Sequence, residues 1–230
     1  MIHLHVRDAE GRHSLDADHY AAAIAAIRQR VGDDLIVQVT TEAAGRYGPH
    51  EQMRVIEALR PEAVSIAIRE LFADPAIELI ATSYLHALAA RSTFVQYIVY
   101  DADDLRRCAA LHAAGIIPQR SPSVLIVLCS YADQRAGAVR DLVPLLAAMP
   151  QGWAWAVCAF GPAELRCVIA AALHGGDIRV GFENNLQLPW GETANSNAAL
   201  VQATVAALSP LGFRAATCAE ARHRLRDLSS

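Results

Sequence analysis

Short apolar runs alternate with longer segments of helical periodicity along the whole chain. Runs rich in Val, Ile and Leu are typical of buried strands, and they predict strands at residues 1–6, 35–40, 62–67, 94–100, 123–129, 153–159 and 177–182. The segments between and after them predict helices near residues 17–31, 50–59, 74–90, 102–114, 135–148, 162–174, 195–208 and 218–227. Helix signals support these bounds, since Asp16 stands as an N-cap before the first helix and Gly115 ends the fourth.

The regular alternation of strand and helix predicts parallel strands joined by helical crossovers. A doubly wound sheet and a (β/α)8 barrel both fit this pattern. No Gly-rich dinucleotide fingerprint follows the first strand and no GxxxxGK[ST] motif occurs, which weakens the nucleotide-binding sheet. Seven β/α units are visible rather than eight. We therefore expect one α/β domain over residues 1–230, a TIM-type barrel short of one unit.

Composition and charge exclude several classes of protein. Hydrophobic residues make up 53% of the chain and charged residues 19%, which favours a large core over disorder. A net charge of -4 and a pI of about 6.1 argue against a nucleic-acid partner. The five cysteines show no CxxC spacing, and this indicates reduced thiols in the cytoplasm. No signal peptide is visible, and the longest apolar run, at 124–129, is too short to span a membrane.

The first predicted strand, in "MIHLHVRD", places polar groups at alternate positions. Since alternate side chains of a strand share a face, His3, His5 and Arg7 share one face. The inward face of a parallel barrel lines its centre, and the carboxyl ends of its strands carry the chemistry. Two imidazoles at this spacing suit a divalent cation such as zinc, while two hydrogen-bonded histidines in a polar interior are the alternative.

The last predicted strand, in "DIRVGFENN", supplies a third ligand for such a cation. Strand alternation puts Arg179, Gly181 and Glu183 on one face, with Glu183 at the carboxyl end of the strand. This is the level at which we expect it to meet His3 and His5. A carboxylate that only neutralises Arg179 is the other interpretation.

Together these segments resemble the beta-keto acid cleavage enzyme family. The resemblance rests on "IHLHVRDAEGRHSLD" at 2–16, "IVQVTT" at 36–41, "GIIPQ" at 115–119, "WAVCAFG" at 155–161, and "IRVGFENN" with "NAALV" at 178–185 and 197–201. It implies a (β/α)8 barrel whose zinc ion is held by His3, His5 and Glu183. It also implies a reaction in which a beta-keto acid and acetyl-CoA, as co-substrate, give acetoacetate and a new acyl-CoA by retro-Claisen chemistry.

The resemblance also assigns roles around the metal. Arg179 would fix a carboxylate or an anionic intermediate, acting with a neighbouring aspartate that serves as a base. A strand-end hydroxyl that contacts the keto acid maps to Thr40, and Thr41 follows it. Relatives assemble as tetramers, so we expect a homo-oligomer, either a tetramer or a dimer. CoA contacts are not readable from the sequence.

This chain departs from the family pattern in three ways. About one β/α unit precedes the HxH strand in relatives, so we expect the first unit of the barrel to be absent here. Either the start of the chain was assigned too late, or a neighbouring subunit covers the gap. Asn184 stands where the family has the aspartate that serves as a base. Asparagine cannot accept a proton, and Asp8 and Glu42 are possible substitutes for this role. Gln96 and Ile98, which share a face with Tyr100, stand where the family has two carboxylates.

These departures keep two further hypotheses open. One is a degenerate, non-catalytic barrel that still binds a metal or a metabolite. The other is a metal-dependent hydrolase or aldolase that shares the barrel and ligand set but does not use acetyl-CoA.

Overall fold

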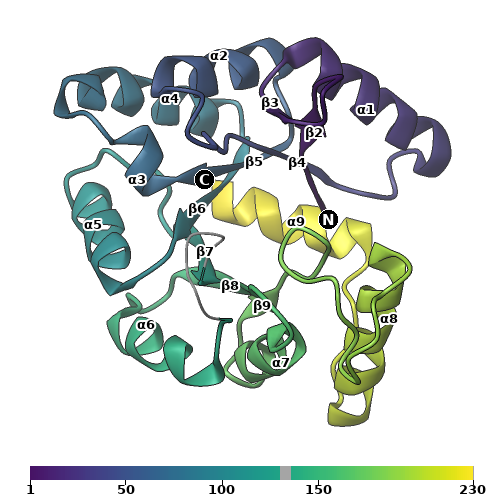
Figure 1. Cartoon of the computed structure of the whole chain (residues 1–230). Helices are drawn as coiled ribbons and strands as arrows, with labels where there is room; N and C mark the ends of the chain where they lie inside the picture. Colours follow the sequence, from purple (N-terminus) through teal and green to yellow (C-terminus); the bar gives the residue numbers. More distant parts are fainter. Residues whose placement is uncertain (130–135, 230) are drawn as a thin grey trace. The chain divides into compact units, whose positions relative to one another are not determined.

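The computed structural model describes residues 1–129 and 136–229, and the chain divides into two compact units. Unit 1 comprises Met1–Ile98, Arg107–Pro122 and Thr217–Ser230, and unit 2 comprises Val99–Arg106 and Ser123–Ala216. The order of helices and strands along the chain can be followed in Figure 1. That residues 1–230 form one domain stays a prediction.

The strands of unit 1 lie side by side in the order β1-β4-β5-β6, and all three pairs are parallel. Their bounds are β1 Ile2–Leu4, β4 Val37–Thr40, β5 Ala63–Ala67 and β6 Phe94–Val99. Every residue of β4, β5 and β6 is buried, as expected for strands covered on both faces. A short antiparallel hairpin, β2 Val6–Arg7 with β3 His13–Ser14, follows β1.

Helices join these strands. They are α1 Ala17–Val31, α2 Pro49–Leu59, α3 Ile68–Leu71, the 3-10 turn η1 Pro75–Ile77, α4 Glu78–Ala90 and α5 Ala102–Ala113. The predicted N-cap at Asp16 is confirmed, because its carboxylate accepts hydrogen bonds from the backbone N–H groups of Asp18 and His19. The Asp16 carboxylate thus caps the start of α1, as the preference of aspartate for that position predicts.

Unit 2 repeats the same strand-and-helix plan. Its parallel strands run in the order β7-β8-β9, with bounds β7 Ser123–Leu128, β8 Ala154–Ala159 and β9 Asp177–Ile178. Its helices are η2 Val139–Asp141, α6 Leu142–Ala148, α7 Glu164–Leu173, α8 Asn197–Leu208 and η3 Ser209–Leu211. Each of the seven predicted strands is thus present among the described residues, and the α/β class is confirmed.

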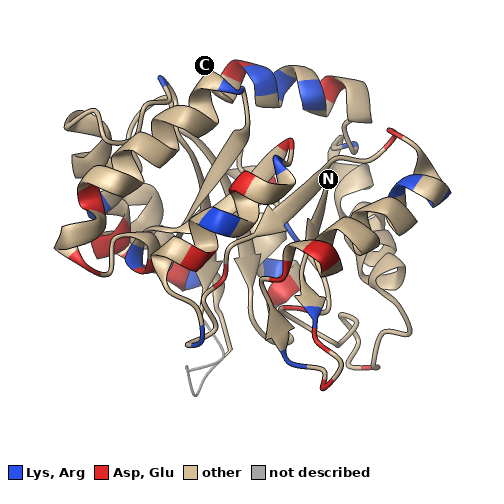
Figure 2. Cartoon of the chain, turned by 90° about the horizontal axis from the view of Figure 1, so that it is seen from above, with Lys and Arg blue, Asp and Glu red and all other residues tan. Residues whose placement is uncertain are grey.

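The C-terminal helix α9, Cys218–Ser229, packs in unit 1 against the beginnings of its strands. Cys218, Ala221, Leu225 and Leu228 contact a buried cluster of Ile36, Ala63 and Phe94. Along its length α9 also carries both basic and acidic residues (Figure 2).

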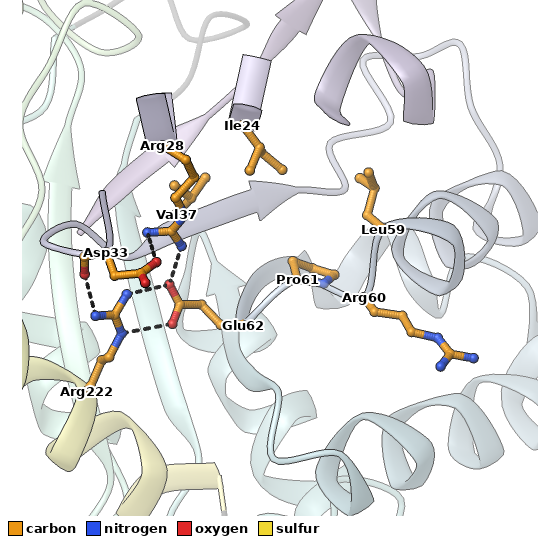
Figure 3. A pocket seen from close by; sticks show the side chains of 9 residues that line it. All are labelled: Ile24, Arg28, Asp33, Val37, Leu59, Arg60, Pro61, Glu62 and Arg222. Carbon is orange, nitrogen blue, oxygen red and sulfur yellow. Dashed lines mark hydrogen bonds and ion pairs between the residues drawn. The ribbon is translucent and has the colours of Figure 1, made fainter. Parts of the chain in front are cut away.

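An ion-pair cluster holds α9 beside a hollow of about 500 Å³ (Figure 3). The Arg222 guanidinium donates to both oxygens of Glu62, at 3.0 and 3.2 Å, and Arg28 donates to the same carboxylate at 3.0 Å. Both guanidinium groups therefore already have acceptors. Their hydrogen bonds to Glu62 link α9 to the start of β5.

Several predicted bounds are corrected. The strand predicted at 1–6 ends at Leu4, because the chain turns into the β2–β3 hairpin, and this leaves Arg7 exposed and donating to the Gly11 carbonyl. The strand predicted at 177–182 ends at Ile178. The helix predicted at 135–148 begins outside the described residues, and its described part is η2 with α6. No helix in the described part of the chain has the length and apolar character needed to cross a membrane.

Candidate metal and substrate site

The two histidines of the first strand meet in unit 1. His3 Nε2 lies 2.9 Å from His5 Nε2, although β1 itself ends one residue before His5. The other nitrogen of each ring faces an oxygen, since His3 Nδ1 lies 2.8 Å from Gln38 Oε1 and His5 Nδ1 lies 3.3 Å from Glu42 Oε2. The predicted proximity of the imidazoles is therefore present.

These contacts bear on which ring nitrogens carry hydrogen. A hydrogen bond between the two Nε2 atoms needs a proton on one of them, while the other accepts. An Nδ1–H on both rings would instead suit the facing oxygens of Gln38 and Glu42, and it would leave both Nε2 lone pairs for one shared cation. Metal-bound histidines use this pattern, in which an oxygen acceptor orients the ring through its remaining N–H.

Gln38 is a site residue that the sequence analysis missed. It lies on β4 directly opposite His3 in the parallel register and is 1% exposed. While its oxygen faces His3, its amide nitrogen donates to Gln96 Oε1 at 3.3 Å. This hydrogen bond fixes which end of the Gln38 amide faces the imidazole. A lone polar residue in the middle of "IVQVTT" was the available signal.

The two threonines expected to bind substrate, at the end of β4 and just after it, have different environments. Thr40 is buried and, by strand alternation, shares the face of Gln38, where its hydroxyl accepts from the Glu42 N–H. The Thr41 hydroxyl donates to the Ser65 carbonyl at 2.9 Å. Thr40 thus lies on the histidine side of β4, while the proton of the Thr41 hydroxyl is already used within unit 1.

A third histidine, His13, lies beside the pair. His5, His13 and Glu42 offer ligand atoms within 4.8 Å of one another. His13 Nε2 is 2.9 Å from the Glu42 carbonyl, and burial lowers the pKa of His13. This arrangement packs a neutral imidazole against the segment that carries Glu42.

Two positions of β6, Gln96 and Ile98, are uncharged where the family pattern has carboxylates. Gln96 is 6% exposed and hydrogen-bonds to Gln38, and Ile98 is 8% exposed. Gln96 on β6 therefore extends the hydrogen-bonded series from His3 to Gln38 without adding charge.

Unit 2 brings together Arg179, Glu183 and Asn184. Arg179 Nη2 donates to Glu183 Oε1 at 3.0 Å, to Asn184 Oδ1 at 3.3 Å and to Cys158 Sγ at 3.1 Å. Burial raises the pKa of Cys158 to about 11, so this sulfur is a neutral thiol. Glu183 and Asn184 therefore both contact one guanidinium nitrogen of Arg179, so the three predicted polar residues of this segment lie together.

The reason for this clustering differs from the one we predicted. β9 ends before Arg179, and the backbone N–H groups of Asn184 and Asn185 both donate to the Gly181 carbonyl. Glu183 therefore reaches Arg179 across a tight turn, and the expectation that strand alternation joins them is wrong. Gly181 permits this turn, because a Cβ at that position would lie 3.1 Å from the Asn197 side-chain oxygen.

Three buried donors near this turn lack an acceptor among the described residues: Arg179 Nε, Arg179 Nη1 and Asn184 Nδ2. Buried polar groups are nearly always hydrogen-bonded in native proteins, and a guanidinium fork matches the geometry of a carboxylate. This donor set suits an anionic ligand. The sharing of one cation by Glu183, His3 and His5, which belong to different units, stays a prediction.

Known proteins resemble this chain over most of its length. The profile of the beta-keto acid cleavage enzyme family matches residues 1–226. A 3-keto-5-aminohexanoate cleavage enzyme of Fusobacterium nucleatum subsp. nucleatum is 30% identical over 234 residues, which cover 98% of this chain and 82% of that protein. A 3-oxoadipate:acetyl-CoA acetyltransferase of Cupriavidus necator is 26% identical over 239 residues, covering 96% and 79%.

Solved structures show the same fold. The apo structure of ObcA superposes with a TM-score of 0.70 at 14% identity, and its binary complex with oxaloacetate superposes with 0.75. These matches cover 98% of this chain, which spans 61% and 62% of the ObcA chains. They confirm the predicted fold class, in which the seven parallel strands match a partial TIM-type barrel. With the profile spanning residues 1–226, this chain belongs to the beta-keto acid cleavage enzyme family.

Proposed function

We propose that this chain is a zinc-dependent enzyme that converts a beta-keto acid and acetyl-CoA into acetoacetate and a new acyl-CoA. One observation carries the metal dependence. The Nε2 atoms of His3 and His5 lie 2.9 Å apart, while the Nδ1 of each ring faces an oxygen of Gln38 or Glu42. Imidazoles held by oxygen acceptors at Nδ1 can offer both Nε2 lone pairs to one cation, and with a carboxylate they are ligands that zinc favours.

His3 and His5 would hold the zinc ion together with Glu183. When bound, zinc polarises a carbonyl oxygen and stabilises the negative charge that develops there. Gln38 and Glu42 would then hold both imidazoles in the tautomer whose lone pair is on Nε2. Removal of either oxygen acceptor would free the ring to turn or to change tautomer.

Arg179 would bind the anionic end of the keto acid. Its Nη2 is occupied by Glu183 and Asn184, while its Nε and Nη1 have no acceptor among the described residues. The Nε–H and Nη1–H point in different directions, so each can donate a separate, charge-assisted hydrogen bond to an anion. Thr40, with Thr41 beside it, would contact the keto acid from the end of β4.

Asn184 would orient Arg179 and donate its amide N–H, but it cannot act as the base. Of the two substitutes considered, Asp8 is engaged by Arg12. Desolvation raises the pKa of Asp8, but the hydrogen bonds and charge of Arg12 together lower it by more. The pKa of Asp8 is therefore below its ordinary value, which makes this carboxylate a weak base. Glu42, beside His5, is the better candidate for accepting a proton.

Relatives support the choice of co-substrate, since one is named as an acetyl-CoA acetyltransferase acting on 3-oxoadipate. We carry acetyl-CoA to this chain as part of the proposal, and we include assembly as a homo-oligomer, a tetramer or a dimer. The beta-keto acid itself is a small anion whose carboxylate suits Arg179.

A combined metal and turnover assay tests this function. Purified protein is analysed for zinc, and beta-keto acids are screened with acetyl-CoA for release of acetoacetate. We expect bound zinc and turnover that disappears in Glu183→Gln and persists in the control Glu192→Gln, because the Glu192 carboxylate lies on the surface and accepts from the Trp190 indole. Zinc without turnover on any keto acid would instead support a non-catalytic metal-binding barrel, and turnover without CoA a hydrolase or aldolase.

A further inference from the structure

A buried carboxylate in unit 2, Glu164, lies under the turn that carries Glu183 and Asn184. It is the first residue of α7 and is 2% exposed. One oxygen accepts from the Gly181 N–H at 3.2 Å, and the other accepts from the Asn185 amide at 3.1 Å. The carboxylate therefore holds the turn at both ends, two residues on either side of Glu183.

Neighbouring contacts fix the rest of the turn. The Phe182 N–H donates to the Asn197 side chain at 2.8 Å, and the Gly161 N–H donates to the Asn184 carbonyl at 3.0 Å. The Asn185 side chain also makes two hydrogen bonds to the backbone of Gln187. Its amide N–H donates to the Gln187 carbonyl at 2.7 Å, and its oxygen accepts from the Gln187 N–H at 2.9 Å. Among these anchors, Glu164 is the one that joins the two ends of the turn to a helix.

We propose that Glu164 is a positioning residue, whose carboxylate fixes the 181–185 turn so that Glu183 and Asn184 face Arg179 and the metal ligand is presented in one geometry. This inference rests on the proposed function for the role of Glu183, but the holding of the turn stands on the contacts above. A glutamine in the same place has one oxygen and one N–H donor. It can accept from one of the two donors, but its own N–H faces the other. One of the two hydrogen bonds to the turn is therefore lost with little change in side-chain volume.

The surroundings of Glu164 set the pH at which its carboxylate becomes charged. Burial raises the pKa of Glu164 to about 7, against the lowering effects of its hydrogen bonds to Asn185 and Gly181 and of the Arg179 charge. Cys158 and Cys167, whose pKa values burial raises to about 11, also lie near it as neutral thiols. Only the ionised carboxylate accepts from both donors without a hydrogen of its own between them.

Two variants of the full-length chain test this inference. Glu164→Gln removes one acceptor from the turn. Val168→Ala is the matched control, because it creates a small cavity at a fully buried position of the same helix and leaves the Glu164 carboxylate unchanged. Hydrogen exchange is measured over residues 179–187, zinc affinity by competition with a chelator, and turnover at several pH values.

In Glu164→Gln we expect exchange over 179–187 to accelerate and zinc affinity to fall about tenfold, as for other outer-shell partners of metal ligands. The pH dependence of turnover near neutrality should also flatten, and none of these changes should appear in Val168→Ala. Unchanged exchange in Glu164→Gln would overturn the holding of the turn, whatever the enzyme does. Accelerated exchange with unchanged zinc affinity and turnover would overturn the positioning role. Wild-type protein that neither binds zinc nor turns over would refute the proposed function, while exchange would still decide whether Glu164 holds the turn.

Discussion

Replacement of Gln38 by leucine tests how the metal ligands are oriented. Leucine keeps the volume of the buried side chain but removes the oxygen that accepts from His3 Nδ1 at 2.8 Å. A buried donor left without an acceptor costs about 1–3 kcal/mol, which corresponds to a factor of roughly 5–150 in an equilibrium constant. Since the imidazole loses its fixed tautomer as well, we expect Gln38→Leu to weaken zinc binding by about 10–100-fold.

Chelator competition at a fixed pH measures this effect, and Gln38→Glu is the matched control. The glutamate retains an oxygen acceptor for His3, so its zinc affinity should equal or exceed that of the wild type. Gln96→Leu removes only the contact one residue further along the chain of amides and should cost less than Gln38→Leu. Wild-type zinc affinity in Gln38→Leu would refute the orienting role of this hydrogen bond and the tautomer that it assigns.

Three further predictions follow from the other contacts. Arg179→Lys keeps the positive charge but loses the fork, so kcat/KM for the keto acid should fall by about 10–100-fold while zinc affinity changes little; equal losses of both would contradict a substrate role. In a double-mutant cycle of urea unfolding, Glu62→Gln with Arg222→Met should give a coupling on the order of 0.5–1 kcal/mol, because screening weakens a pair whose Glu62 side chain is 36% exposed. A coupling of zero would show that α9 is held by its apolar contacts alone. Because the pKa of Glu164 lies above its ordinary value of 4.5, the folded state retains a proton that the unfolded state releases, and this contribution to stability is lost as pH rises from 4.5 to about 7. Unfolding at pH 5 and pH 8 should therefore show wild type losing stability relative to Glu164→Gln as pH rises, and a constant difference would refute the raised pKa.

Local sequence patterns predicted the strands and helices well, because periodicity and capping act over a few residues. All seven predicted strands are present, and α1 has the predicted bounds of 17–31. The hairpin of β2 and β3 and the four-residue helix α3 were missed. Elements this short have too few residues to show a period, and their pairing depends on neighbours distant in sequence.

The candidate site was predictable where it depends on side-chain alternation and unpredictable where it depends on pairing between strands. Two residues of spacing suffice to bring His3 and His5 together. The contact of His3 with Gln38 depends on the register of β1 against β4, which lie 35 residues apart. Arg179 and Glu183 were correctly placed together for the wrong reason, since a turn after Ile178 replaces the extended strand.

A zinc titration of metal-free protein tests the central claim most directly. The proposal predicts one zinc ion per chain, bound by His3, His5 and Glu183, with affinity reduced at least about tenfold in His5→Ala and in Glu183→Gln and unchanged in Glu192→Gln. Wild-type affinity in Glu183→Gln, or absence of zinc binding by the unaltered chain, would contradict it.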